Sequence, residues 1–449
     1  MKKFFTTISN IWKIDDLRVR ITNTLLFLLI YRIGSFVVLP GVNPNSISKG
    51  GSEGITGLLN MFAGGSFARA SIFALGVMPY ISASIVVQLL GIAVPYFAKL
   101  QKEGESGRNK LNQWTRYLTI GITVLQAVGY LKSQINADPT AGQMEIANPF
   151  FTILNVFVLT AGTMFVMWLG EKITDKGIGN GISLIIMVGI IAALPGAFLS
   201  EFQSRNAGGG GLVTFVVEIV ALIGVVMFTV LIVQGTRKIA VQYAKRIVGN
   251  KQYGGVRQYI PLKVNAAGVM PIIFAQALMF IPATITQFWK GGSTNPIVMS
   301  LADSRSWGHN ITFAVLIIVF TFFYTAITIN PNQMAEDMKK NGGFIPGIKP
   351  GRSTAEFIDG VISKITLPGS IFLAIIAIFP AIASFVGVTS AFARFFGGTS
   401  LIILVGVVLD TLQQIESHLL MRHYDGLMKT GRIKGRTSIA AGGAGQPTI

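Results

Sequence analysis

The sequence contains no cysteine, and only 12% of its 449 residues are charged. The absence of cysteine excludes disulfides, thiolate nucleophiles and cysteine-based metal sites. Acidic residues are especially scarce, with 19 Asp and Glu against 37 Lys and Arg. Because a soluble chain of this length carries about twice that share of charge, these shortages argue against a water-soluble globular protein.

Groups that commonly carry catalysis are also few. The three histidines show no metal-binding spacing. The stretch GGFIPGIKP, which begins at Gly342, has Ile348 where a phosphate-binding loop has Lys. The Gly-rich GIGNG at 177–181 indicates a tight turn. We therefore expect no enzyme activity, no cofactor and no metal, so that any energy for its work comes from a partner or a gradient.

Hydrophobic residues, by contrast, make up 51% of the chain and occur in long runs. About 20 mostly apolar residues cross the hydrocarbon of a bilayer as a helix. Such runs are found at residues 21–39, 72–96, 115–135, 151–169, 179–199, 212–234, 266–288, 312–330, 369–388 and 399–417. The sequence therefore predicts an all-α polytopic membrane protein with ten transmembrane helices.

The positions of the basic residues predict the orientation. Most of the 37 Lys and Arg lie at the N-terminus, in the tail after 417 and in alternate loops between the runs. Since cytoplasmic loops carry an excess of Lys and Arg, both termini are expected in the cytoplasm. Two basic loops, 235–264 and 331–365, are longer than the topology needs, and tyrosines are interleaved in the first. They favour docking of a large, negatively charged partner, such as a nucleoprotein surface or an acidic protein.

The tetrapeptide GVMP occurs twice, at Gly76 and at Gly268, near the starts of the second and seventh runs. Five runs separate the copies, and an odd number reverses the orientation. We therefore predict two inverted five-helix halves, in which Pro79 and Pro271 bend their helices near the start. The cytoplasmic N-terminal segment, the two halves and the cytoplasmic tail are assigned to residues 1–20, 21–200, 201–417 and 418–449.

The predicted spans hold few ionisable groups, and Arg32, Glu218 and Asp410 are interpreted as boundary residues or a structural pair. They do hold branched aliphatic pairs four residues apart, which share a helix face, but periodicity does not decide whether such a face meets lipid. The stretch 57–71 is too short to cross the bilayer. It is either a short external half-helix tucked into a cavity or an interfacial helix lying on the membrane.

Several stretches resemble the SecY family of protein-conducting channels, the central subunits of the bacterial Sec translocon. GGSFARASIFALGVMPYISASIVVQLL and WLGEKITDKGIGNGISLII are similar to the two signature stretches of that family. PLKVNAAGVMPIIFA, NPNQMAEDMKKNGGFIPGIKPG and FGGTSLIILVGVVLD resemble its seventh span, its loop between spans eight and nine, and its tenth span. The resemblance covers about residues 15–436. One departure is Lys349, where the family usually has Arg, a planar two-pronged donor.

The resemblance implies two halves clamped around an hourglass pore, with functional residues at four places. The implied pore ring is Ile81, Ile85, Ile182, Ile186, Ile273 and Ile403. The implied plug, within about 57–71, is Leu58, Leu59, Asn60, Met61, Phe62, Ala63, Gly64, Gly65, Ser66, Phe67, Ala68 and Arg69. The implied polar residues of the lateral gate, between spans 2–3 and 7–8, are Gln88, Gln126 and Gln276. The implied partner-binding residues are Arg246, Lys251, Arg257, Lys340, Lys349 and Arg352.

The function implied by the resemblance is a channel of the bacterial inner membrane. It would pass unfolded secretory polypeptides across and release hydrophobic segments laterally into the lipid. The implied partners are SecE-like and SecG-like small membrane subunits, the motor ATPase SecA, the ribosome, and signal sequences with their unfolded clients. Two alternatives remain open: a secondary transporter, which would need a compact polar site at mid-membrane, and a scaffold that anchors ribosomes in the membrane without conducting anything.

Overall fold

The computed structural model describes residues 12, 14–42, 57, 60–132, 148–208, 211–243, 246–248, 251–253, 257–288, 296, 300–301, 303 and 306–430. Two residues of the implied plug, Leu58 and Leu59, lie outside this set, as do most of the N-terminal segment and the end of the tail. Long helices make up most of the described chain. Those that overlap the ten predicted runs are α2 (Asp15–Gly34), α4 (Met78–Ala93), α6 (Glu105–Tyr130), α7 (Asn148–Lys176), α8 (Gly181–Asn206), α9 (Gly211–Gln234), α10 (Met270–Phe288), α12 (Trp307–Thr328), α14 (Arg352–Phe385) and α16 (Gly398–Thr430).

Length and apolarity identify several of these helices as membrane spans. Among the described residues, six helices can cross a bilayer by these measures, namely α7, α8, α9, α12, α14 and α16. A seventh span results if α4 is joined to α5 (Pro95–Lys102), which departs from it at an angle of 103°. The chain is thus a multi-pass membrane protein, and its lipid-facing surface is rich in exposed apolar side chains, above all along α9.

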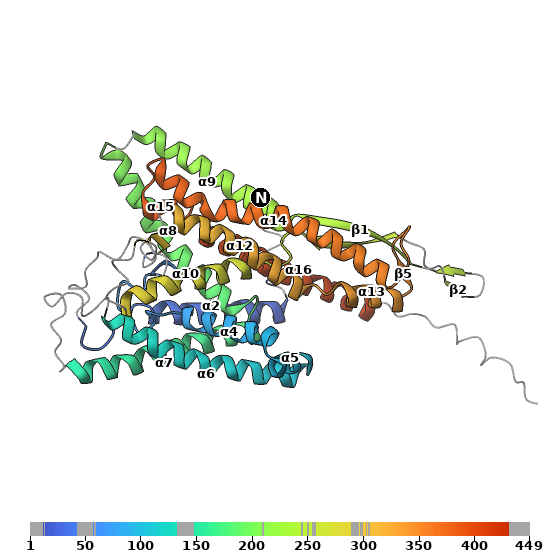
Figure 1. Ribbon diagram of the computed structural model, residues 1–449, viewed down its shortest axis with the longest axis horizontal. Coiled ribbons are helices and arrows are strands. Elements are labelled where there is room, and N and C mark those ends of the chain that lie inside the picture. Colours follow the sequence, from blue (N-terminus) through green and yellow to red (C-terminus); the bar gives the residue numbers. More distant parts are fainter. Residues whose placement is uncertain are drawn as a thin grey trace, which may run out of the picture.

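The helices form two groups that lie side by side. In Figure 1, α6 and α7 run along one long side of the molecule and α9 and α14 along the other, with α10 and α16 between them. Within the first group α6 packs against α4 and α7, and within the second α14 packs against α12 and α16. Contacts of α8 with α9 and α16, and of α10 with α4, join the groups. A continuous apolar core therefore runs through both.

The two copies of GVMP adopt the same local conformation. Gly76 and Gly268 have φ angles of 53° and 65°, a region that glycine enters without the steric cost of a side chain. The helix that follows begins at the third letter of each copy, α4 at Met78 and α10 at Met270. The repeat in the sequence is thus also a repeat in backbone structure.

The prediction that Pro79 and Pro271 bend these helices is wrong. Each proline is the second residue of its helix, where the N–H that proline lacks would have no intrahelical partner. The stretches before them, at 72–77 and 264–269, form turns. The prolines therefore help to begin α4 and α10.

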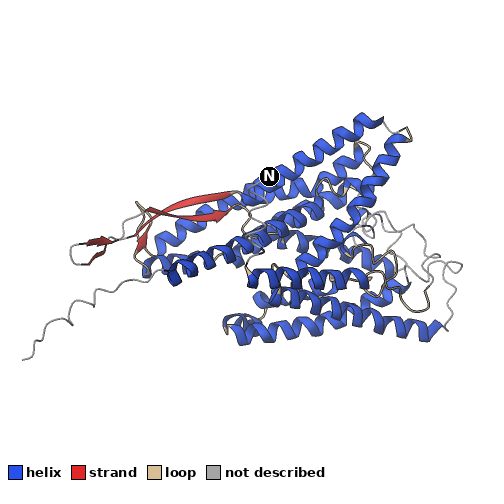
Figure 2. Cartoon of the chain, turned by 180° about the vertical axis from the view of Figure 1, so that it is seen from behind, coloured by secondary structure: helices blue, strands red, loops and turns tan. Residues whose placement is uncertain are grey.

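The loop between α9 and α10 departs from the all-α prediction. In it, β1 (Thr236–Tyr243) and β4 (Arg257–Lys263) pair as an antiparallel ribbon, and a separate hairpin joins β2 (Arg246–Val248) to β3 (Lys251–Tyr253). The loop before α14 adds β5 (Gly343–Phe344) to the other edge of β1. Figure 2 shows these strands in red at one end of the molecule, where the long ribbon runs beside helices and the short hairpin projects beyond them.

This strand region has its own hydrophobic core. Ile239 and Val241, two positions apart on one face of β1, are buried at 8% and 0% exposure. They cluster with Met338 of α13 (Pro331–Lys340) and with Ile358 of α14. The alternation of apolar residues in TRKIAVQY was a strand signal, but the sequence had been interpreted only as a long basic loop. The two basic loops, 235–264 and 331–365, therefore form one packed unit, here called the strand unit.

Candidate channel constriction and plug

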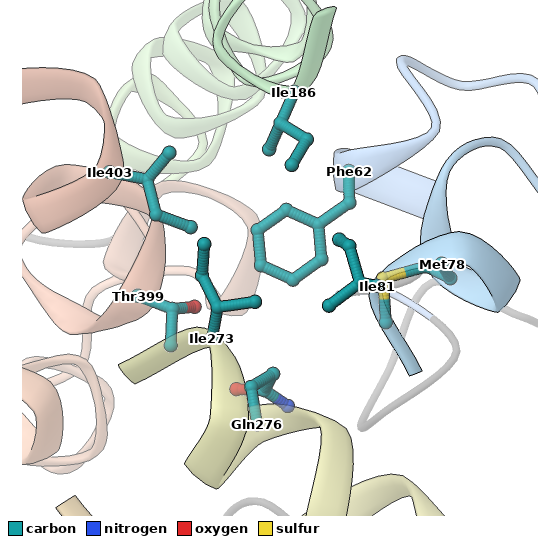
Figure 3. Close-up of a pocket in the computed structure, with 8 residues that line it drawn as sticks. All are labelled: Phe62, Met78, Ile81, Ile186, Ile273, Gln276, Thr399 and Ile403. Atoms are coloured by element: carbon teal, nitrogen blue, oxygen red, sulfur yellow. The ribbon is translucent and has the colours of Figure 1, made fainter. Parts of the chain in front are cut away.

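Four helices from both groups send a branched aliphatic side chain into one small cavity. Ile81 comes from α4 and Ile186 from α8, while Ile273 comes from α10 and Ile403 from α16. Figure 3 shows these four side chains around the ring of Phe62. The remaining lining residues are Met78, Gln276 and Thr399.

The cavity is almost filled. The centre of a water molecule can move within only about 10 Å³ of it, which is close to the least that holds a single water. Nearly all of the lining is apolar, with Gln276 and Thr399 supplying the polar atoms. A space of this size has no room for a hydrated ion, and its two polar side chains are too few to replace the water shell of an ion.

The other two isoleucines of the implied ring do not line this cavity. Ile85 lies on α4 four residues beyond Ile81 and is 6% exposed. Ile182, at the start of α8, lies against Gly170 of α7, where an added Cβ would come within 2.7 Å of its Cγ1 atom. The structure thus brings four of the six residues together at the cavity, and the ring role of all six stays a prediction.

Residues 60–70, here called the plug segment, contribute Phe62 to the lining of the cavity. They begin with a short helical turn and continue through turns whose glycines, Gly64 and Gly65, have φ angles of 64° and 84°. Asn60 organises this fold, because its backbone carbonyl accepts from the Gly65 N–H (2.7 Å) and its side-chain oxygen from the Ala68 N–H (2.9 Å). The turn places Phe62, 5% exposed, in the constriction.

Hydrogen bonds from neighbouring helices hold the plug segment by its backbone carbonyls. The Tyr130 hydroxyl of α6 donates to the Phe67 carbonyl (2.7 Å), and the Tyr31 hydroxyl of α2 lies 3.4 Å from the Ala63 carbonyl. The guanidinium group of Arg32 in α2 donates to the Gly64 carbonyl at 2.8 Å, and within the segment Arg69 donates to the same carbonyl at 2.8 Å. Arg32 of α2, interpreted as a boundary residue, therefore binds the plug segment.

Gly189 of α8 lets the plug segment lie against that helix. A Cβ at this position would be 2.7 Å from the Phe62 carbonyl oxygen and 3.0 Å from the Gly64 nitrogen. Both are backbone atoms, so the overlap is not relieved by rotating a side chain. Sequence reasoning missed this residue, because a glycine in an apolar run gives no sign of what it contacts.

The three glutamines implied for the lateral gate occupy different surroundings. Gln276 of α10 lines the cavity, is 4% exposed, and its Nε2 atom has no hydrogen-bond partner among the described residues. Gln88 of α4 and Gln126 of α6 are half-buried and do not line the cavity. Because α10 packs against both α4 and α6, the three residues belong to adjoining helices. Their role at a gate stays a prediction.

The implied partner-binding residues all fall in the strand unit. Arg246, Lys251 and Arg257 are the first residues of β2, β3 and β4. The other three have exposed side chains: Lys340 ends α13, Lys349 lies in the following turn, and Arg352 begins α14. The Arg352 side chain forms an exposed ion pair with Glu356 at 3.2 Å. Their contact with partners stays a prediction.

A buried ionic network joins α8, α9 and the segment before α15 (Ser390–Ala393). Arg205 forms ion pairs with Glu201 (2.9 Å) and Glu218 (2.5 Å) and donates to the Gly387 carbonyl (2.8 Å). Glu201 in turn accepts from the backbone N–H of Thr389 (2.9 Å) and from its hydroxyl. The interpretation of Glu218 as part of a structural pair is confirmed. The spacing of Glu201 and Arg205, four apart on one helix face, was the signal for its partners.

Comparison with known proteins agrees with this geometry. The fold is that of solved protein-conducting channels: one such channel is 20% identical with a TM-score of 0.66, covering 92% of this chain and 95% of its own. A Sec61 channel in a canine ribosome–channel complex from the endoplasmic reticulum gives a TM-score of 0.62 at 19% identity, covering 92% of this chain and 95% of its own.

The sequence places the chain within this class. The family model SecY matches residues 71–412. The protein translocase subunit SecY of Streptomyces coelicolor is 43% identical, with 94% of this chain and all of the relative covered. That of Mycobacterium tuberculosis is 44% identical, with 92% and 97% covered. The chain belongs to the SecY family.

Proposed function

We propose that this protein is a channel that passes unfolded secretory polypeptides across the bacterial cytoplasmic membrane and releases hydrophobic segments sideways into the lipid. The observation that carries the proposal is the constriction, in which four isoleucines from four helices surround Phe62 of the plug segment. An aliphatic ring makes no strong bond to a passing chain and excludes ions by dewetting when closed. A transporter site would need several converging polar groups, and this cavity has few.

The proposed architecture has ten spans in two inverted halves. Its support is the shared geometry of the two GVMP copies, which each place a left-handed glycine two residues before a helix start. Each half also contributes two isoleucines to the cavity. The excess of Lys and Arg at the ends of the chain and in the strand unit supports the cytoplasmic placement of both termini.

The proposed opening step is displacement of the plug segment. Tyr130, Tyr31 and Arg32 hold it through single hydrogen bonds to carbonyl groups, and each such bond contributes about 0.5–3 kcal/mol net. A signal sequence that inserts beside α4 and α10 gains several kcal/mol by burying its apolar side chains. Binding that favours the open state can therefore shift the equilibrium.

The proposed partners are the ribosome, SecA, and SecE-like and SecG-like small membrane subunits. The strand unit supports docking of the ribosome and SecA, because it presents basic residues on a packed platform outside the helices. The solved Sec61 relative lies in a ribosome–channel complex. Exposed apolar faces on α2 and α9 are the surfaces available to lipid and to small membrane subunits.

Replacing Ile186 by aspartate is the direct test of the constriction. The carboxylate would hydrate the ring and bind cations there, so the resting ion efflux from reconstituted vesicles should rise severalfold. Ile186→Leu keeps the apolar lining and should leave efflux unchanged. Vesicles that contain the unmodified protein, supplied with SecA, ATP and a signal-bearing substrate, should import the substrate. A protein that folds but imports no substrate would overturn the proposed function.

Removing three positive charges from the strand unit should weaken its binding to ribosomes and make that binding less sensitive to salt. The triple variant Arg246→Ala, Lys251→Ala and Arg257→Ala removes up to three phosphate contacts, which lowers the slope of log affinity against log salt by about two to three. The measurement is co-sedimentation with ribosomes across a salt series. A matched control neutralises Lys99, Lys110 and Lys176, which lie on α5, α6 and α7. Equal losses in both variants would count against docking at the strands.

A further inference from the structure

A groove of about 390 Å³ lies in the strand unit, apart from the constriction. Its lining comes from residues 237–240 of β1, from Ile345 and Pro346 after β5, and from Phe357 and Val361 of α14. None of the six cations proposed above to contact partners lines it. Its volume falls within the range of ligand-binding clefts.

The groove follows the edge of β1. Successive side chains of a strand point to opposite faces, so a groove over one face would be lined by every second residue. Here all four consecutive residues 237–240 line it. One edge of β1 pairs with β4 from Thr236 to Gln242. On the opposite edge, β5 pairs only with Gln242 and Tyr243. Within the described chain, the edge at 237–240 therefore has no strand partner.

The chain after β5 leaves this edge open for an identifiable reason. Continuing the register would place Pro346 opposite Ala240, and proline has no N–H to donate to the ladder. The following Gly347 has a φ angle of 85°, and the Ile348 N–H donates to the Ile345 carbonyl at 3.0 Å. This turn carries the chain away from β1. An unpaired edge of this kind is a template for an added strand.

The walls of the groove indicate what kind of strand would fit. Ile239 and Ile345 are nearly buried and belong to the core of the strand unit, so the apolar floor of the groove is the part of its lining that packs into this core. Phe357 adds an aromatic wall that is 40% exposed. Arg237 and Lys238 are exposed at the groove and form no ion pair with the described residues. The groove thus combines an apolar floor with two unpaired positive charges.

We propose that this groove binds an extended, acidic segment of a cytoplasmic protein, which pairs with β1 as an additional strand. Its apolar side chains lie against Ile239 and Phe357, and its carboxylates face Arg237 and Lys238. Four residues of strand edge extend for roughly 13 Å, so a short segment suffices. The site is separate from the constriction and does not require that the channel conduct.

The probe is a short fluorescent peptide in which aspartate and valine alternate. The full chain in lipid nanodiscs should bind it, as measured by fluorescence anisotropy, with affinity that falls as salt is added. A second peptide carries the same side chains but is methylated at alternate backbone nitrogens, which removes donors needed for strand pairing. It should bind about tenfold more weakly or worse. Equal binding of both peptides, or no binding of either, would overturn the proposal.

Two variants locate the binding. Arg237→Ala with Lys238→Ala removes the charges of the groove, and its matched control, Lys339→Ala with Lys364→Ala, removes two exposed cations that do not line it. Only the first should weaken binding, again by about tenfold. Phe357→Asp should also weaken it, and the change is at an exposed position. If the control pair loses as much affinity as the groove pair, the peptide binds by general charge attraction and the groove is not its site.

Discussion

Replacing Gly189 by valine should unseat the plug segment and raise the resting ion conductance of the reconstituted protein by roughly tenfold to a hundredfold. The added Cβ would lie 2.7 Å from the Phe62 carbonyl oxygen and 3.0 Å from the Gly64 nitrogen. Overfilling a close-packed site costs about 1–3 kcal/mol, and each 1.4 kcal/mol changes a population ratio about tenfold. The strain is relieved when the plug segment moves away, so the open population grows.

Gly196 supplies the matched control on the same helix. No heavy atom lies within 4 Å of a Cβ built there, so Gly196→Val tests the effect of valine on α8 without touching the plug segment. Gly189→Ala, which adds the Cβ alone, should give an intermediate conductance. Ion efflux from proteoliposomes is the measurement for all three. If Gly189→Val folds and stays as tight as the unmodified protein, residues 60–70 do not form the seal.

Replacing Arg205 by methionine should destabilise the fold by about 3–5 kcal/mol. Arg205 is 9% exposed and neutralises two buried carboxylates, those of Glu201 and Glu218. Removing one partner from a buried ionic network leaves uncompensated charge in a low-dielectric region, which costs more than the pairing itself gained. The shift is read from denaturant or thermal unfolding in detergent.

A triple variant separates lost charge balance from lost packing. Adding Glu201→Gln and Glu218→Gln to Arg205→Met removes the uncompensated carboxylates while keeping the volume nearly constant, so most of the stability should return. The control Arg352→Met breaks an exposed ion pair and should change stability by less than about 1 kcal/mol. A loss for Arg205→Met as small as that of the control would show that the network contributes little.

Local sequence patterns were sufficient for the features that repeat or that follow periodicity. The GVMP copies predicted a structural repeat, and both begin a helix after a left-handed glycine. The apolar runs predicted the helices, although α4 and α10 start several residues later than expected because their prolines are placed at helix starts. The four isoleucines of the cavity were named from the family resemblance, since spacing alone did not separate a pore-facing from a lipid-facing side.

Features that depend on contacts between distant segments were not predictable in the same way. The role of Gly189 depends on backbone atoms of residues more than a hundred positions away. The pairing of Arg205 with Thr389 through Glu201 depends on where the segment before α15 lies. The strands were missed because a high basic content was interpreted as a long loop that docks a partner, whereas Ile239 and Val241 provide enough apolar surface to pack on α13 and α14.

The way the plug segment is fastened has an evolutionary consequence. The side chains outside the segment that donate to it, Tyr31, Arg32 and Tyr130, belong to the surrounding helices, and their acceptors are main-chain oxygens at Ala63, Gly64 and Phe67. Any amino acid supplies such an oxygen. Selection on the surrounding helices can therefore preserve the fastening while the plug segment drifts in composition at positions other than Asn60, Phe62 and its two glycines, and plug segments from distant homologues that keep these four residues should yield chimeras that still close.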